Sequence, residues 1–273
     1  MYSMLRNCFN FSLLIILLVN LNSNAEQKIA FLFLVRGHIH FETIWKEFFT
    51  FRVRPDEYSI YVHPQKGFHF KNTSFFYRKE ISHTIQTVYL KASVQEAERE
   101  LLKTALEDKE NAFFCLISES CIPIHPFQAM KSALIKSGKS TVNACPTEPG
   151  ISELKARWRP ELDTVPGMNQ SLWRKSVQQF SLIRKHAELV AYDELLFKAF
   201  EHVNIPDEHY IPTLLAWKGL DNETTCAGGF AYVRYGVTGV HPKTFRFFLY
   251  LFYLYYDSIL YYIILFYLIT LNI

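Results

Sequence analysis

The sequence has little excess charge and no block of basic residues. Its 273 residues carry a formal net charge of only +3, and the 29 lysines and arginines are spread along the chain. Nucleic-acid-binding domains usually concentrate their positive charge in a patch or stripe. The composition therefore argues against a nucleic-acid partner.

Cysteine is also scarce, and no C-x-x-C pair or zinc-like His/Cys spacing occurs. One of the five cysteines, Cys8, lies in an apolar run at the N-terminus. The other four, Cys115, Cys121, Cys145 and Cys226, allow three pairings, which the sequence leaves open. Cys115 lies in an apolar run, so we expect a small buried hydrophobic residue there.

Carboxylates arranged to hold a metal ion are missing as well. No Asp-x-Asp sequence occurs, and the alternating Glu96, Glu98 and Glu100 fall on a predicted helix. On a helix these three side chains point in different directions and cannot share one ion. We expect them to form a solvated helix face, and we predict no metal site.

Long hydrophobic runs occur only at the two ends. The run at residues 8–21 is short for a bilayer span of roughly 20 residues, so residues 1–27 are predicted to be a cleaved signal peptide or an uncleaved signal anchor. The tail at residues 246–273 is long enough to cross a membrane, but its Phe and Tyr residues are not confined to the two interfaces. A membrane span and read-through into non-coding sequence both remain open for this tail.

Residues 28–245 alternate between strand and helix patterns. Continuous apolar runs predict buried strands at residues 29–35, 58–63 and 112–117. Apolar residues at helical spacing predict helices at 41–48, 127–136, 185–200 and 207–217, and a Ser93/Glu96 capping box predicts the start of another. Shorter runs at 75–77, 85–90 and 141–145 are candidate strands. This order predicts an α/β domain with a mainly parallel sheet flanked by helices.

Ligands of such sheets bind at the carboxyl ends of the strands. The residues to examine there are Arg36, His63 and the loop Ser118-Glu119-Ser120. A polar loop at 146–170 is long enough to suggest function. The cations and aromatic ring of Trp173-Arg174-Lys175 could bind phosphate or sugar.

Two carboxylates, Asp207 and Glu208, open a predicted helix. They could simply cap that helix and complement its dipole. The same helix-end donors could also prepare Glu208 to accept a proton from a sugar hydroxyl. Position alone does not decide between these interpretations.

Seven runs in fixed order resemble one known family. They are KIAFLFLVRG (28–37), YSIYVH (58–63), LISESCIP (116–123), WRK with Gln178 (173–178), RKHA (184–187), DEHYIPT (207–213) and HPKTF (241–245). Together they resemble the plant branch of the core-2/I-branching β-1,6-N-acetylglucosaminyltransferase family over about residues 28–245.

The resemblance implies a GT-A-like nucleotide-sugar-binding domain in a type II membrane glycoprotein of the Golgi apparatus, with the domain in the lumen. It implies an inverting transferase that needs no metal or other cofactor and moves N-acetylglucosamine or a related sugar from a UDP donor to a glycan or glycoprotein hydroxyl. Glu208 matches the family's general base. Arg36 and His63 match strand ends near the nucleotide, and Ser118–Ser120 and Trp173–Lys175 match the lining of the donor and acceptor cleft.

The chain also departs from the family pattern. Ser176-Val177-Gln178 replaces the usual Gly-Ser-Gln, and the hydrophobic tail stands where the family has a basic residue against the UDP diphosphate. We therefore expect no transferase activity from the 273-residue form. A catalytically inactive glycan-binding or scaffold relative is the main alternative. A hydrolase using Asp207 with Glu208 is a weaker one, because adjacent carboxylates on a helix diverge while glycosidases need two that flank the bond.

Three N-x-S/T sequons in polar stretches generate the first prediction. We expect Asn72, Asn169 or Asn222 to carry glycan, because the hydrophobic N-terminus would direct residues 28–245 into the secretory lumen. Glycosidase digestion of protein made in plant cells should increase its gel mobility. Unchanged mobility would contradict the prediction.

Overall fold

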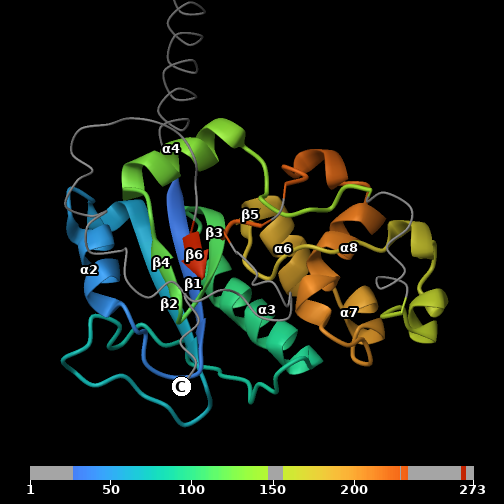
Figure 1. The fold of residues 1–273 in the computed structure, drawn as a ribbon, viewed down its shortest axis with the longest axis horizontal. Helices are drawn as coiled ribbons and strands as arrows, with labels where there is room; N and C mark the ends of the chain where they lie inside the picture. The colour runs from blue at the N-terminus through green and yellow to red at the C-terminus, as the bar shows by residue number, and fades with distance from the viewer. Residues whose placement is uncertain (1–26, 147–155, 228, 233–265, 269–273) are drawn as a thin grey trace, which may run out of the picture.

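The computed structural model describes residues 27–146, 156–227, 229–232 and 266–268. Its centre is a four-stranded sheet in the order β2-β1-β3-β5 (Figure 1). Strands β1 (Lys28–Val35), β2 (Tyr58–Pro64) and β3 (Asn111–Ser118) run parallel, while β5 (Ser181–Ile183) runs antiparallel to β3. The three predicted buried strands and the mainly parallel α/β sheet expected of a GT-A-like domain are confirmed.

Side chains of the sheet alternate between two hydrophobic clusters. On β1, Ala30 and Leu32 face one cluster, while Phe31 and Phe33 face the other. Strand β3 alternates in the same way, and its Cys115 is buried and unpaired, as predicted. Both faces of the sheet are therefore covered, as the continuous apolar runs require.

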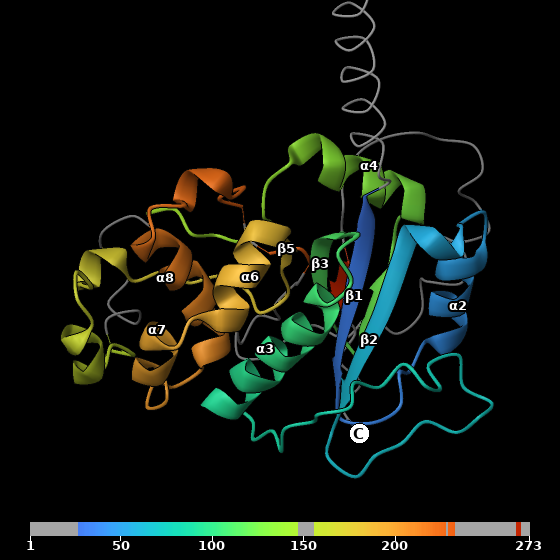
Figure 2. The same cartoon turned by 180° about the vertical axis from the view of Figure 1, so that it is seen from behind.

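One face is covered by α2 (Glu42–Thr50) and α4 (Phe127–Ser137) (Figure 2). Trp45 of α2 is fully buried, and its indole nitrogen donates to the Cys121 carbonyl at 3.0 Å. Gly138 ends α4 in the left-handed conformation, with φ of 59°. Glycine adopts this conformation without strain and is a common residue at the end of a helix.

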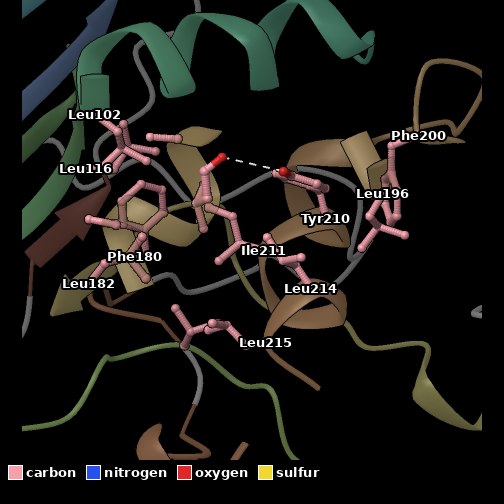
Figure 3. Packing of buried hydrophobic residues seen from close by; sticks show 14 of the residues in the cluster. Leu102, Leu116, Phe180, Leu182, Leu196, Phe200, Tyr210, Ile211, Leu214 and Leu215 are labelled. Atoms are coloured by element: carbon pink, nitrogen blue, oxygen red, sulfur yellow. Dashed lines mark hydrogen bonds between the residues drawn. The ribbon is translucent and has the colours of Figure 1, made fainter. Parts of the chain in front are cut away.

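The opposite face is covered by α3 (Ala92–Leu106) and α6 (Arg184–Tyr192). Beyond them lie the shorter helices α7 (Leu195–Ala199) and α8 (Tyr210–Trp217). Figure 3 shows how Leu102, Leu116 and Phe180 meet side chains of α8 such as Ile211 and Leu214. This contact joins the helical part of the domain to the sheet.

Several local expectations are wrong. The capping box does not form: the α3 N-cap is Lys91, and the Ser93 hydroxyl instead accepts the Val88 N–H at 2.9 Å. Residues 75–77 and 85–90 are not strands, and the Ile85 N–H is bound by the His63 ring at 2.8 Å. Side chains thus take the backbone donors that a sheet would need.

The segment at 141–145 and the two C-terminal helices also differ from expectation. Thr141 forms only an isolated bridge to Ser181. The helix expected at 185–200 divides into α6 and α7 because the Asp193 carboxylate accepts the Phe197 N–H at 3.0 Å, as at a helix start. The helix expected at 207–217 is a 3-10 turn, η4 (Pro206–Glu208), followed by α8.

A short strand, β4 (Cys121–Pro123), follows the Ser118–Ser120 loop and pairs antiparallel with β6 (Phe266–Leu268) of the tail. Cys145 is disulfide-bonded to Cys226, 81 residues away, but Cys115 and Cys121 are not bonded to each other, so none of the three complete pairings forms. Cys121 is a buried free thiol.

The predicted N-terminal targeting segment and most of the hydrophobic tail lie outside the described residues. Within the described part of the chain, no helix combines the length and apolarity needed to cross a bilayer. Asn72, Asn169 and Asn222 are all exposed, so their side chains are accessible for the predicted glycosylation.

A buried arginine joins α3 to the end of α6. The Arg99 side chain is 4% exposed and donates to the carbonyls of Val190, Ala191 and Asp193 at 3.1, 3.2 and 2.6 Å. Its guanidinium also lies 3.9 Å from the Phe197 ring centroid. These carbonyls are among those left without partners where a helix ends.

We predict that Arg99→Ala lowers the free energy of unfolding by roughly 3 kcal/mol, because buried carbonyls lose this charged donor. Lys103→Ala on the same helix is the matched control, since that side chain is 36% exposed. Chemical denaturation monitored by circular dichroism measures both. A change for Arg99→Ala as small as that of the control would contradict this role.

Candidate functional site

The carboxyl ends of β1 and β3 are joined by an ion pair. The Glu119 carboxylate accepts the Arg36 backbone N–H at 2.7 Å and its side-chain Nε at 2.6 Å. The Arg36 side chain remains 85% exposed, while that of Glu119 is 12% exposed. Glu119 therefore holds the backbone and the guanidinium Nε of Arg36 at this edge, while the rest of the side chain stays exposed.

His63 ends β2 at the same edge but is fully buried. Because its Nε2 accepts the Ile85 N–H, the neutral ring carries its hydrogen on Nδ1, which is buried without a partner. Burial lowers the pKa of His63, which keeps the ring neutral. The predicted role near a nucleotide stays a prediction.

The Ser118–Ser120 loop makes a compact polar turn between β3 and β4. The Ser118 hydroxyl lies 3.2 Å from the Ser120 hydroxyl and 3.2 Å from the Cys121 sulfur. The structure thus brings Arg36, Glu119 and the two serines together at the edge where ligands of parallel sheets bind.

Glu208 lies on η4, at the centre of a cluster of charges. Its Oε2 contacts Nη1 of Arg157 at 2.7 Å and Nζ of Lys175 at 3.3 Å. The three side chains are 23%, 28% and 42% exposed, respectively. Both ion pairs end on Oε2, and no described residue forms a hydrogen bond with Oε1.

The backbone just before Glu208 is strained. Ile205 has φ of 55° and ψ of 53°, the left-handed conformation that a β-branched residue rarely adopts. Its N–H donates to the Leu90 carbonyl at 3.4 Å, and Pro206 follows it directly. Such strain persists only where the surrounding structure imposes it, and it occurs often at functional sites.

His209 and Trp173 support this cluster from inside. The buried His209 ring stacks on the Trp173 ring, with centroids 4.4 Å apart. Its Nδ1–H donates to the Arg174 carbonyl at 2.7 Å, which leaves Nε2 to accept from Arg157 at 3.1 Å. Burial lowers the pKa of His209 to about 4, so the ring is neutral and does not repel Arg157.

Trp173 and Arg174 themselves are not presented to solvent. Trp173 is 5% exposed and Arg174 is 6% exposed. The Arg174 guanidinium donates to the carbonyls of Ala144, Ser171 and Trp173 at 3.0, 2.6 and 3.1 Å. Of the predicted Trp173–Lys175 stretch, only Lys175 therefore reaches Glu208, and the ligand contacts predicted for the other two stay predictions.

Arg157 and His209 are participants that the sequence did not single out. Arg157 lies in the loop at 146–170, whose length had suggested a function. No local signal pairs it with Glu208, which is 51 positions away. Its partner became visible only in the folded chain.

The three glutamates of α3 diverge as expected, but one of them is not solvated. Glu96 is exposed and Glu100 pairs with Lys103 at 2.7 Å, whereas Glu98 is fully buried. The expectation of a solvated face is therefore wrong for Glu98, because α3 turns this side chain toward Gln178 of the segment that leads to β5. Over the described ranges, no group of three or more His, Cys, Asp or Glu side chains is placed to hold a metal ion.

Comparisons with known proteins agree with the resemblance noted in the sequence. The family model described as Core-2/I-Branching enzyme matches residues 29–252, which extends past residue 245 into the tail. A curated rice protein, Glycosyltransferase BC10 of Oryza sativa subsp. japonica, is 32% identical over 229 residues. That alignment covers 72% of this chain and 55% of the rice protein, so the chain spans about half the length of the curated relative it matches.

The family match covers most of the chain, and it includes the strand ends, the Ser118–Ser120 loop and the turn that carries Glu208. On these grounds the chain belongs to the Core-2/I-branching enzyme family.

Proposed function

We propose that this chain is a glycosyltransferase domain that moves a sugar from a UDP donor to a glycan hydroxyl, with inversion and without a divalent metal. N-acetylglucosamine or a related sugar is the proposed group transferred. The observation that carries the proposal is the state of Glu208. One carboxylate oxygen is held by two cations, and the other has no described partner.

In the proposed reaction, Glu208 Oε1 accepts the proton of the acceptor hydroxyl as its oxygen attacks the anomeric carbon. The bond from that carbon to the UDP oxygen breaks on the opposite side, and UDP leaves as the anion. A single displacement of this kind inverts the anomeric centre. Arg157 and Lys175 fix the carboxylate, which is what a general base within reach of its proton requires.

The donor diphosphate needs positive charge if no metal neutralises it. Lys175 is the most exposed cation next to Glu208, and the exposed guanidinium of Arg36 lies at the strand ends. Charge-assisted hydrogen bonds from such groups suit phosphate. His63 and the serines of the Ser118–Ser120 loop are the proposed polar contacts for the nucleotide-sugar, with Glu119 holding Arg36 in place.

A Golgi membrane protein with a lumenal domain is the proposed setting. The Cys145–Cys226 disulfide supports it, because such bonds persist in oxidising compartments. The three exposed sequons are consistent with the same compartment.

A glycan-binding relative without catalysis is the second candidate. It is favoured by one observation: Ser176-Val177-Gln178, directly after Lys175, differs from the Gly-Ser-Gln that is usual in the family. A measurement of UDP binding distinguishes a chain that has a donor site from one that lacks it.

We expect isothermal titration calorimetry to detect binding of UDP to this chain, with the same affinity in the presence and absence of EDTA. Lys175→Ala should weaken binding about tenfold, because a charge-assisted contact to phosphate is lost. Lys198→Ala, on the exposed side of α7, is the matched control and should have no effect. Absence of UDP binding would favour the second candidate, and loss of binding on adding EDTA would overturn metal independence.

For catalysis, we expect Glu208→Gln to reduce kcat by at least about a hundredfold, the scale of general-base loss. We would make the substitution at the matching glutamate of a longer family member. The position matching Glu188, which is 51% exposed on α6, is the control. A loss smaller than about tenfold would remove the general-base role.

A further inference from the structure

The buried Glu98 of α3 is an unusual carboxyl group, and its surroundings are well defined. Its Oε2 accepts a hydrogen bond from Nε2 of Gln95 at 2.7 Å, and its Oε1 accepts one from Nε2 of Gln178 at 2.8 Å. It is fully buried, and it forms no ion pair with any cation of the described segments. An isolated ionised carboxylate in such a place is strongly disfavoured.

Two buried oxygen atoms near Glu98 lack a hydrogen-bond donor. They are Oε1 of Gln95 and Oδ1 of Asp207. A protonated Glu98 supplies one O–H donor, and Oδ1 of Asp207, whose charge acts on Glu98, is a buried acceptor without one. One proton on Glu98 therefore removes a buried charge and offers a donor to this acceptor.

The charges around Glu98 favour the same assignment. From η4, Asp207 adds negative charge, while Arg157 and Lys175 contact Glu208 instead of Glu98. Burial, reinforced by the charge of Asp207, raises the pKa of Glu98 well above its usual value. Burial also raises the pKa of Asp207 to about 6, so Asp207 is ionised above that pH.

Glu98 hydrogen-bonds one of the two segments that form the Glu208 cluster, and its helix packs against the other. Gln178 is three positions after Lys175 on the irregular segment that leads to β5, and η4 packs against α3. The same two segments are joined directly by the Ser176 N–H, which donates to the Glu208 carbonyl at 2.9 Å. A buried side chain that holds Gln178 and Asp207 in place therefore also holds Lys175 and Glu208 at a fixed distance from each other.

We propose that Glu98 is a positioning residue for Glu208: a buried, neutral carboxylic acid whose hydrogen bonds pin Gln178 and the Asp207 side of η4, so that Glu208 stays in register with Arg157 and Lys175. Its importance for transfer rests on the proposed function. Its protonation and its hold on the two segments do not, and they can be measured without turnover.

The first measurement is the infrared spectrum of the whole 273-residue protein. At about pH 8, where Asp207 has lost its proton, we expect a carbonyl band of a protonated carboxylic acid that disappears in Glu98→Gln. Glu96→Gln, an exposed glutamate on the same helix, is the matched control and should leave the band in place. Persistence of the band in Glu98→Gln, or its absence from the unsubstituted protein, would overturn the neutral acid.

The second measurement is hydrogen exchange followed by mass spectrometry. Glu98→Ala should speed exchange about tenfold or more in peptides covering residues 174–180 and 205–210, because both segments lose their shared anchor. Glu98→Gln should restore slow exchange, since an amide mimics a neutral acid of the same shape. Glu98→Gln exchanging as fast as Glu98→Ala, or neither differing from the unsubstituted protein, would overturn the positioning role.

These outcomes are distinct from failure of the proposed function. If Glu98 behaves as expected while UDP does not bind, the positioning of Glu208 stands and the donor site is wrong. If UDP binds but the two Glu98 readouts fail, the donor site stands and Glu98 is an ordinary buried side chain.

Discussion

The burial of β1 on both faces is the constraint on which the rest of the domain depends. This strand pairs in parallel with β2 on one side and β3 on the other, and its residues from Ile29 to Phe33 are completely buried. Each large apolar side chain hidden in this way contributes about 1.5–3 kcal/mol. Parallel pairing then places Arg36, His63 and Ser118 at one edge, because all three strands end there. The location of the candidate site follows from that geometry.

A second constraint is that buried polar groups need partners, and it separates the structural cations from the available ones. Arg99, Arg174 and Arg184 all donate to backbone carbonyls, where they stabilise the ends of helices and loops. Lys175 and Arg157 instead contact a carboxylate that remains partly exposed. Residue type alone does not distinguish these two groups. The distinction comes from whether the charged atoms bind backbone carbonyls, as those of Arg99 and Arg184 do although each also contacts an exposed glutamate.

Much of the framework was predictable because it depends on short-range pattern. Buried strands appear as continuous apolar runs, and the α4 helix is bounded by Pro126 and Gly138. Local signals failed where a side chain competed for the backbone donors that the expected element needed. His63 takes the Ile85 N–H, and Ser93 takes the Val88 N–H in place of a helix cap. The helix expected at 185–200 is divided at Asp193, because the Asp193 carboxylate accepts the backbone N–H of Phe197 in the following turn.

The sequence by itself determined the α/β class, the edge of the sheet that carries the ordered motifs, and Glu208 as the carboxylate to examine. Only the tertiary structure decided which residues Glu208 meets, which cations stay available, and that Glu98 is buried. Arg157 and Glu208 are 51 positions apart, and Gln178 and Glu98 are 80 apart. Periodicity reports which side of an element is buried, since that depends on near neighbours along the chain. It carries no information on which distant side chain will be packed against that side, because this is set by how the elements are arranged in space.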